Sequence, residues 1–372
     1  MKDKAVNAGV TAQTGFELQR NCALLLILDD YTSYKDKSFF VCIEHQDDFL
    51  FAFTTNDHKT LQEVYTYQSK NKSGSIWTIN ADFGEIITKI LGTGTNLIQD
   101  NMSKTNDYKH KLTFVSNTDM SLKYNPNDEE KGEGKEPVSI KVNEMNEIQS
   151  FKSLHSDIRN KINSSVKDYC KKNTKKFDED EFNNLTLQWV DFPKTANKQR
   201  EALIGLMHSK FPHVVDPKAS IELFIELFRN VEQTYNQGDI ASLLDESKRL
   251  YAEDLKATLD IIEKEQRTYE KWRNHAETFA PTFKIPLLVQ ESAKDKIRET
   301  FEYLKDLNNL DHKKIQKFIY DNDYRAKYYS LVEIFKGYVS EIRESERINL
   351  NDIDIFFTCL CVYVEFYDKG NL

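Results

Sequence analysis

Two short polar segments carry the residues of this chain whose types and spacing suit phosphodiester chemistry. One is the acidic run from Glu44 to Asp48, and the other is the triplet Gln68, Ser69 and Lys70; each follows or ends an apolar stretch with β-strand character. Carboxylate oxygens bind hard divalent cations such as Mg²⁺, and a lysine ammonium stabilises negative charge that develops on a phosphate. Acidic groups on one strand beside a Gln-x-Lys triplet on the next are what metal-dependent cleavage of a phosphodiester requires.

The strand pattern around these segments predicts that they meet. The expected strands cover residues 39–43, 49–53 and 63–70, and a polar turn joins the first two. On the third strand Gln68 and Lys70 have the same parity, so their side chains emerge on one face of the sheet. Asp48 begins the second strand directly after the turn. If the second and third strands are neighbours, Asp48, Gln68 and Lys70 converge at one end of the sheet.

Each residue of this set has an expected role. Asp48 is the main metal ligand, and the Gln68 side-chain oxygen and the Ser69 carbonyl complete the inner shell. Lys70 orients or deprotonates the attacking water and stabilises charge in the transition state. The metal, Mg²⁺ or Mn²⁺, supplies Lewis acidity and lowers the pKa of bound water. Glu44 is expected to bind a second metal or a water of the outer shell.

Asp47 and Gln19 complete the candidate set. Asp47 either shares the role of Glu44 or fills the turn. Gln19, on the first expected helix, either orients the site from the side or caps a backbone group inside the fold. Taken singly, paired aspartates are common in turns, and Gln and Lys are common on edge strands. Only the joint pattern therefore indicates a catalytic site.

Composition bounds the class of protein. The chain has 372 residues and is 39% hydrophobic, which is enough for two or three domains with sizeable cores. Its 12 glycines and 7 prolines favour long helices over an all-β design. The net charge of -9 excludes a globally basic nucleic-acid binder, although a few placed Lys and Arg residues can still line a local cleft. Five cysteines without a CxxC pair, and no apolar leader or membrane-length run, predict a reduced, cytoplasmic setting.

A helical part is expected to follow the strand-rich part. Thr14 and Glu17 predict a capping box at the first helix, and the polar residues 125–137 predict a flexible loop. The other expected elements are helices over 12–28, 76–91, 240–279, 291–307, 312–320 and 323–345, strands over 111–115 and 186–190, a linker at 236–239, and an apolar run at 353–366 that is core or interface. We therefore expect an α/β domain over residues 1–215 and a mainly α-helical domain over 216–372, the second serving interaction or oligomerisation.

Three segments stand in a recognisable order: Gly15 to Gln19, Glu44 to Asp48, and Gln68 to Lys70. Together they resemble the double-stranded DNA endonuclease effector domain of bacterial anti-phage systems such as CBASS, and residues 76–78 and 114–117 are similar to its later segments. The resemblance covers about residues 8–210. It implies a restriction-endonuclease-like PD-(D/E)xK fold of the Mrr-like branch, with Asp48, Gln68 and Lys70 at the positions of the motif's Asp, Glu or Gln, and Lys.

The same resemblance implies a setting. The helical part looks more like the nuclease subunit of Lamassu systems, which works with an SMC-type ATPase, than like the ligand-sensing domain of the CBASS enzymes. It implies a Mg²⁺-dependent endonuclease on double-stranded DNA that a partner ATPase keeps inactive and that release or oligomerisation activates. The alternatives are the nuclease subunit of a HerA-type ATPase complex, a non-catalytic adaptor that binds its partner through the helical half, and cleavage of RNA rather than DNA.

Two further patterns bear on partners. Residues 92–95 (Gly-Thr-Gly-Thr) are not a P-loop, because no Gly-Lys-Ser/Thr follows, so ATP hydrolysis is expected of a partner and not of this chain. Lysines are dense between Lys161 and Lys176, with acidic residues directly after them. That cluster either flanks a DNA cleft or forms a solvated helix face.

Overall fold

The structure, a computed structural model, describes residues 8–72, 75–212, 214, 216–234, 242–306, 309–345 and 347–368. It divides the chain into two compact units. The first comprises Met1–Lys210 with Ile221–Lys256, and the second comprises Phe211–Ser220 with Ala257–Leu372. The domain boundary expected from the sequence, between residues 215 and 216, lies inside the short middle segment that belongs to the second unit.

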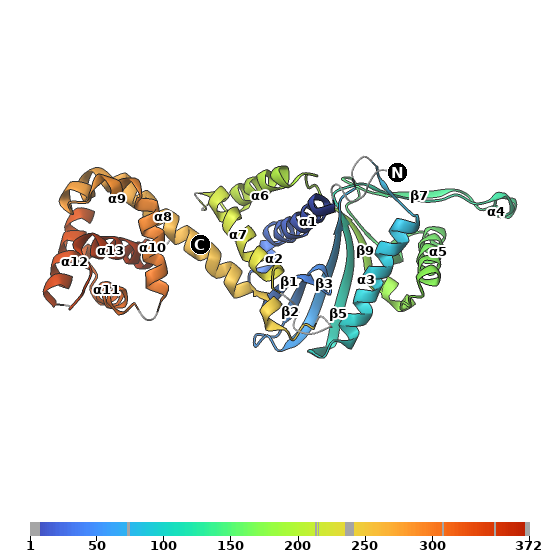
Figure 1. The fold of residues 1–372 in the computed structure, drawn as a ribbon, viewed down its shortest axis with the longest axis horizontal. Coiled ribbons are helices and arrows are strands. Elements are labelled where there is room, and N and C mark those ends of the chain that lie inside the picture. The colour runs from blue at the N-terminus through green and yellow to red at the C-terminus, as the bar shows by residue number, and fades with distance from the viewer. Residues whose placement is uncertain are drawn as a thin grey trace. The chain divides into compact units, whose positions relative to one another are not determined.

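A seven-stranded sheet, counted over the described residues, is the frame of the first unit and has the order β10-β1-β2-β3-β5-β9-β8 (Figure 1). Its strands are β1 (Phe39–His45), β2 (Asp47–Thr54), β3 (Thr60–Lys70), β5 (Ser103–Ser116), β8 (Ile148–Ser150), β9 (Leu185–Trp189) and β10 (Leu250–Tyr251). β1, β2 and β3 form an antiparallel meander, whereas β3, β5 and β9 run parallel. The C-terminal ends of β3, β5 and β9 and the N-terminal end of β2 therefore lie on the same side of the sheet, where these strands end.

A smaller sheet and a set of helices complete this unit. The smaller sheet, three strands among the described residues, joins β4 (Trp77–Thr78), β6 (Met120–Tyr124) and β7 (Val138–Val142) in the order β4-β6-β7. The helices are α1 (Ala8–Asp29), α2 (Tyr31–Tyr34), α3 (Ala81–Gln99), α4 (Asp128–Gly132), α5 (Ser156–Asn173), α6 (Ala196–Lys210) and α7 (Pro217–Glu232), with 3-10 turns at Phe151–Ser153, Glu179–Asn184 and Glu246–Lys248.

The two faces of the large sheet bury different helices because side chains alternate along each strand. Phe40 and Leu50, on one face, belong to the same buried cluster as Ile87 of α3. Phe51, of the opposite parity, packs its ring on Tyr34 of α2 at a centroid distance of 6.1 Å. Figure 1 shows α1 and α3 on opposite sides of the sheet. Residues of even number in β2 thus face α3, which fixes the side on which Asp48 lies.

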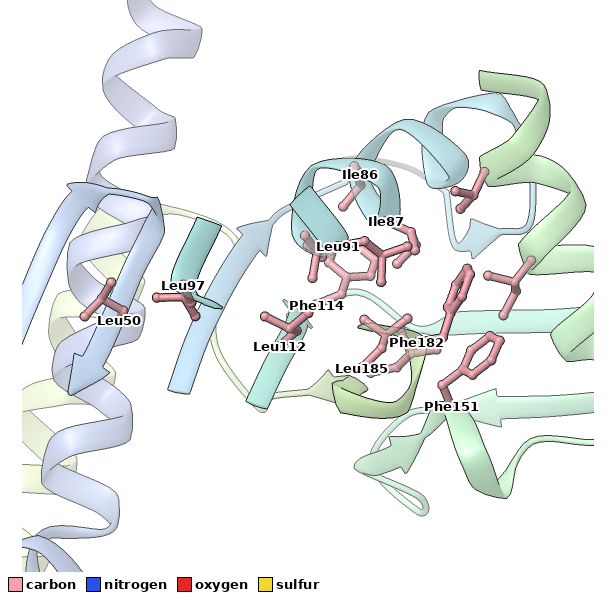
Figure 2. Packing of buried hydrophobic residues seen from close by; sticks show 14 of the residues in the cluster. Leu50, Ile86, Ile87, Leu91, Leu97, Leu112, Phe114, Phe151, Phe182 and Leu185 are labelled. Carbon is pink, nitrogen blue, oxygen red and sulfur yellow. The ribbon is translucent and has the colours of Figure 1, made fainter. Parts of the chain in front are cut away.

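Helix α3 is held against the sheet by its apolar stripe. Figure 2 shows Ile86, Ile87 and Leu91 lying over Leu112 and Phe114 of β5. Burial of each such side chain contributes roughly 1.5–3 kcal/mol. This packing sets the position of the middle of α3, which forms one wall of the site.

The second unit is helical. Its main elements are α8 (Ala252–Thr282), α9 (Leu287–Glu291), α10 (Ala293–Lys305), α11 (Leu310–Asp321), a 3-10 turn at Tyr324–Ala326, α12 (Leu331–Ser345) and α13 (Asp352–Tyr367). Helix α13 is buried along nearly its whole length, and α10, α11 and α12 pack on it. Cys359 and Cys361 lie fully inside this core, and burial raises the pKa of both thiols. In the part of the chain that is described, no helix is both long and apolar enough to cross a membrane.

Three local expectations are wrong, each for a physical reason. Thr14 does not cap the first helix, because α1 already begins at Ala8. The predicted helix at residues 76–91 begins later, since Trp77 and Thr78 pair with β6 and the side chain of Asn80 caps α3 instead. The predicted long helix from residue 240 begins at Ala252, and the residues just before it form a turn and the short β10.

The polar stretch at residues 125–137 is also more ordered than a flexible loop. It connects β6 to β7 in an antiparallel hairpin and contains α4. Asn127 and Glu130 form a capping box at the start of that helix, so the charged residues satisfy backbone groups. The predicted linker at 236–239 lies outside the described residues.

Candidate active site

The carboxylate of Asp48 is the centre of the site. Phe49 pairs with Tyr67 in the antiparallel register of β2 and β3, so one step further Asp48 stands opposite Gln68. Gln68 Nε2 donates to Asp48 Oδ1, and the backbone N–H and the hydroxyl of Ser69 donate to Oδ2 at 2.8 and 3.0 Å. Lys70 Nζ lies 3.4 Å from the same oxygen. The side chains expected to converge at the end of the sheet therefore lie together.

Burial separates the members of this cluster. Asp48, Gln68 and Ser69 are buried, whereas 36% of the Lys70 side chain is exposed. Buried polar groups need hydrogen-bond partners in place of water, and four donors from the protein contact the Asp48 carboxylate. The carboxylate is thus fixed in orientation, and the ammonium beside it is the member that an incoming group can reach.

A pocket of about 430 Å³ opens next to the carboxylate. Its walls are the segment from Glu44 to Asp48, Gln68, and the middle of α3 at Lys89, Gly92, Thr93 and Asn96. The Thr93 hydroxyl donates to the Gln46 carbonyl at 3.1 Å, which ties the β1–β2 turn to α3. The site is therefore a cleft with one wall of sheet and one of helix.

The β1–β2 turn adopts an unfavourable backbone conformation. Glu44 and Gln46 have φ angles of 53° and 65°, in the left-handed region that disfavours residues with a Cβ. His45 Nε2 lies 2.9 Å from the Ser242 carbonyl and helps to hold the turn. Strained backbone of this kind costs on the order of 1 kcal/mol or more per residue and concentrates at functional sites.

Glu44 reaches the site from the turn, and Gln19 reaches it from α1. Burial, and next the charge of Asp48, raise the pKa of Glu44, while a hydrogen bond from Gln19 opposes them. Gln19 is buried, and its Oε1 has no hydrogen-bond partner among the residues that the structure describes. The structure therefore brings both of these candidates to the edge of the Asp48 cluster.

Asp47 differs from its neighbour. Burial, and then the charge of Asp48, raise its pKa to about 8. Asp47 Oδ1 accepts a hydrogen bond from the Asp48 N–H at 3.0 Å. At neutral pH this side chain is largely a neutral acid that shapes the turn, and it lies on the wall of the pocket.

Sequence reasoning missed an ion pair beside the site. Arg20, next to Gln19 on α1, forms a contact of 2.5 Å with Glu232 at the end of α7, and both side chains are almost fully buried. The charge of Glu232 also acts on Glu44. Lys248, fully buried, caps the end of α7 through backbone carbonyls. No local pattern connects Arg20 with a residue so distant in the chain, so only the fold reveals the pair.

Comparison with known proteins places this geometry in a family. A family model described as "Cap4, dsDNA endonuclease domain" matches residues 7–233, which include every residue of the site. The searches of curated proteins and of solved structures find no match for the chain. Membership supports an effector nuclease of anti-phage defence of the CBASS type. Because the matched segment is more than half of the chain, the protein belongs to the Cap4 double-stranded DNA endonuclease domain family and is a DNA endonuclease.

Proposed function

We propose that Asp48, Gln68, Ser69 and Lys70 form the catalytic centre of this endonuclease and that Mg²⁺ or Mn²⁺ is its cofactor. The observation that carries the proposal is the buried Asp48 carboxylate, which Gln68 and Ser69 hold in one orientation beside the half-exposed Lys70 ammonium. Glu44 lines the pocket next to Asp48, and Gln19 forms a hydrogen bond with Glu44.

The chemistry of these residues fits a hard cation. Asp48 and Glu44 offer two carboxylates, and Mg²⁺ is commonly held by one or two carboxylates, with water and substrate phosphate as further ligands. Gln19 Oε1 is a buried oxygen beside Glu44, without a partner in the described part of the chain. The Gln68 amide must turn over for its oxygen to serve, because its nitrogen now faces Asp48. The described residues contain no group of three or more His, Cys, Asp or Glu side chains suited to a metal, so amide and Ser69 carbonyl oxygens would have to contribute.

The residues of the chain divide the work between positioning and charge. Gln68 and Ser69 fix the Asp48 carboxylate, so no reorganisation is needed when substrate arrives. The Lys70 ammonium faces the phosphate oxygens and orients the attacking water by hydrogen bonding. The bound cation would supply Lewis acidity and lower the pKa of water. Asp47, a largely neutral acid, shapes the turn that carries Asp48.

In the cell we propose that a partner ATPase of the SMC type restrains this nuclease, as in Lamassu systems, and that release and homo-oligomerisation activate it. Two active sites brought together would cut both strands of DNA. The helical part from Ala257 onward supports the proposal, since it lies outside the matched nuclease segment and exposes Leu287, Leu288 and Tyr329. A HerA-type ATPase complex is the second setting, and a non-catalytic adaptor is the third reading.

Cleavage of plasmid DNA tests the catalytic proposal. The protein should nick or cut a supercoiled plasmid in Mg²⁺, and chelation should stop it. Lys70→Ala should lower the rate by at least about 10³-fold, because the variant lacks the charge that faces the phosphate. Lys317→Ala, at an exposed lysine of α11 outside the matched nuclease segment, is the control and should cut normally.

Two outcomes would count against the proposal. Undiminished cleavage by a folded Lys70→Ala variant would remove the assignment of the centre. Absence of cleavage by the unmodified protein under any metal, together with intact partner binding, would favour the adaptor. A parallel digestion of RNA separates the two polymers as substrates.

A further inference from the structure

Two lysines in addition to Lys70 lie near the C-terminal ends of β3, β5 and β9. Lys72 follows β3 by two residues, and Lys194 lies in the loop between β9 and α6. Hydrogen bonds bring the two loops together: Asn71 Nδ2 donates to the Lys194 carbonyl at 3.0 Å, and Lys194 Nζ to the Lys72 carbonyl at 3.5 Å. Both lysines therefore lie beside the strand end that bears Lys70.

Trp77 holds Lys72 in place. The Lys72 ammonium lies 4.6 Å from the centroid of the buried Trp77 ring, a cation–π contact. Trp77 Nε1 donates to Ser116 Oγ at 2.9 Å, and Ser116 Oγ donates to the Lys70 carbonyl at 2.7 Å. The same group of side chains thus anchors the backbone of Lys70 and the ammonium of Lys72.

The loop that carries Lys194 is equally fixed. Its Pro193 carbonyl accepts hydrogen bonds from Asn117 at 3.1 Å and from Gln199 at 2.9 Å. Lys194 itself is exposed. Because these contacts hold Lys72 and the backbone at residues 193–194 before any ligand arrives, less conformational entropy is lost when a ligand binds.

Within the described part of the chain, no carboxylate pairs with Lys72 or Lys194. Among the residues that the structure describes, Lys72 and Lys194 form no ion pair, and their ammonium groups contact only a ring face and a carbonyl. Lys89, on the opposite wall of the cleft, is paired with Glu85 at 2.8 Å. In an acidic chain, unpaired ammonium groups next to the site are the charges available to an anionic polymer.

We propose that Lys72 and Lys194 form a phosphate-binding rim that seats the backbone of duplex DNA beside Lys70. The inference rests on the proposed function, because it assumes that the substrate binds at the strand end that carries Lys70. Backbone contacts of this kind position DNA and carry no sequence information. The rim therefore sets where the phosphodiester lies and leaves sequence preference to other parts of the protein.

Metal-free binding of duplex DNA tests the rim separately from cleavage. Fluorescence anisotropy of a labelled duplex in EDTA, over a series of salt concentrations, compares the full-length protein with Lys72→Gln/Lys194→Gln. Glutamine keeps most of the packing on Trp77 and removes the charge. The affinity at low salt should fall on the order of tenfold, and the slope of log K against log salt should shrink by about 1.8, or 0.9 per lost phosphate contact. Lys72→Arg/Lys194→Arg should bind like the unmodified protein.

The matched control is Lys317→Gln/Lys336→Gln, which removes two exposed charges from α11 and α12, outside the matched nuclease segment. This variant should keep both the affinity and the salt slope. Three results would overturn the rim. They are an unchanged salt slope in the Lys72→Gln/Lys194→Gln variant, an equal loss of DNA affinity in the control variant, and no binding of the duplex by the unmodified protein. Lys70→Ala should bind DNA and not cut it. The two proposals therefore fail in different ways: cleavage by Lys70→Ala contradicts the catalytic proposal, whereas unweakened DNA binding by Lys72→Gln/Lys194→Gln contradicts the rim.

Discussion

At the scale of single residues, the site depends on how one carboxylate is held. Asp48 Oδ2 accepts from the backbone N–H of Ser69, from its hydroxyl and from Lys70, while Oδ1 faces Gln68. The donors are not equivalent. The N–H belongs to the backbone and survives any side-chain substitution, whereas the hydroxyl can be removed alone.

Ser69→Ala should therefore weaken the site without abolishing it. The variant loses one hydrogen bond to a buried carboxylate, worth about 1–2 kcal/mol, and keeps the N–H contact at 2.8 Å. We expect kcat/KM for plasmid cleavage to fall about fivefold to thirtyfold, as measured by initial rates. A loss as complete as that of Lys70→Ala would mean that Ser69 has a direct chemical role.

At the scale of elements, the site is the place where α3 closes on the sheet. Gly94 of α3 has no room for a side chain, because a Cβ there would collide with the buried Glu181 carboxylate. That carboxylate cannot move freely, since it pairs with His110 at 2.7 Å and accepts from Asn184 at 3.0 Å. Two residues earlier, and so on the opposite side of the helix, Gly92 has open space around the position of a Cβ.

This contrast predicts opposite effects of two similar substitutions. Gly94→Ala should destabilise the first unit by about 1–3 kcal/mol through overpacking. Gly92→Ala should be neutral or stabilise it by up to about 1 kcal/mol, since alanine favours a helix more than glycine does. Urea unfolding followed by circular dichroism measures both, and equal midpoints for the two variants would contradict the packing argument.

The sequence predicted those features of the site that depend on residues close together in the chain. Parity along β3 and the turn before β2 were enough to expect Asp48, Gln68 and Lys70 together, because an antiparallel pairing fixes which residues face each other. Trp77 was wrongly expected in a helix. Its strand partner in β6 is more than 40 residues away, so the residues near Trp77 give no sign of the pairing. The Arg20–Glu232 pair and the contact of Asn71 with residue 194 join segments far apart in the chain, and no spacing rule anticipates them.

At the scale of the whole molecule, two hydrophobic cores of the described residues lie in different units. One surrounds α3 and the sheet, and the other surrounds α13. Ile87 and Ile319 are completely buried in the first and the second core, respectively. Units with separate cores generally unfold as separate cooperative transitions.

Calorimetry should accordingly resolve two transitions. Ile87→Val and Ile319→Val each remove one buried methylene and should each cost about 0.5–1.5 kcal/mol. We expect the first to lower only the transition that abolishes DNA cleavage, and the second to lower only the other. A single transition that both substitutions shift equally would show that the two units unfold as one.

Helix α13 carries a consequence for how this protein is made. It has almost no polar face, and it comes after α10, α11 and α12, the helices that enclose it. Until residues 352–367 have left the ribosome, α10, α11 and α12 lack the helix on which they pack, and their apolar side chains are exposed to solvent. The nuclease half, by contrast, has the whole of its sheet once residue 251 has been added. During synthesis the chain can thus complete its nuclease fold before it has the helical unit to which we propose that the restraining partner binds. If that proposal holds, the cell must control a free nuclease during this interval.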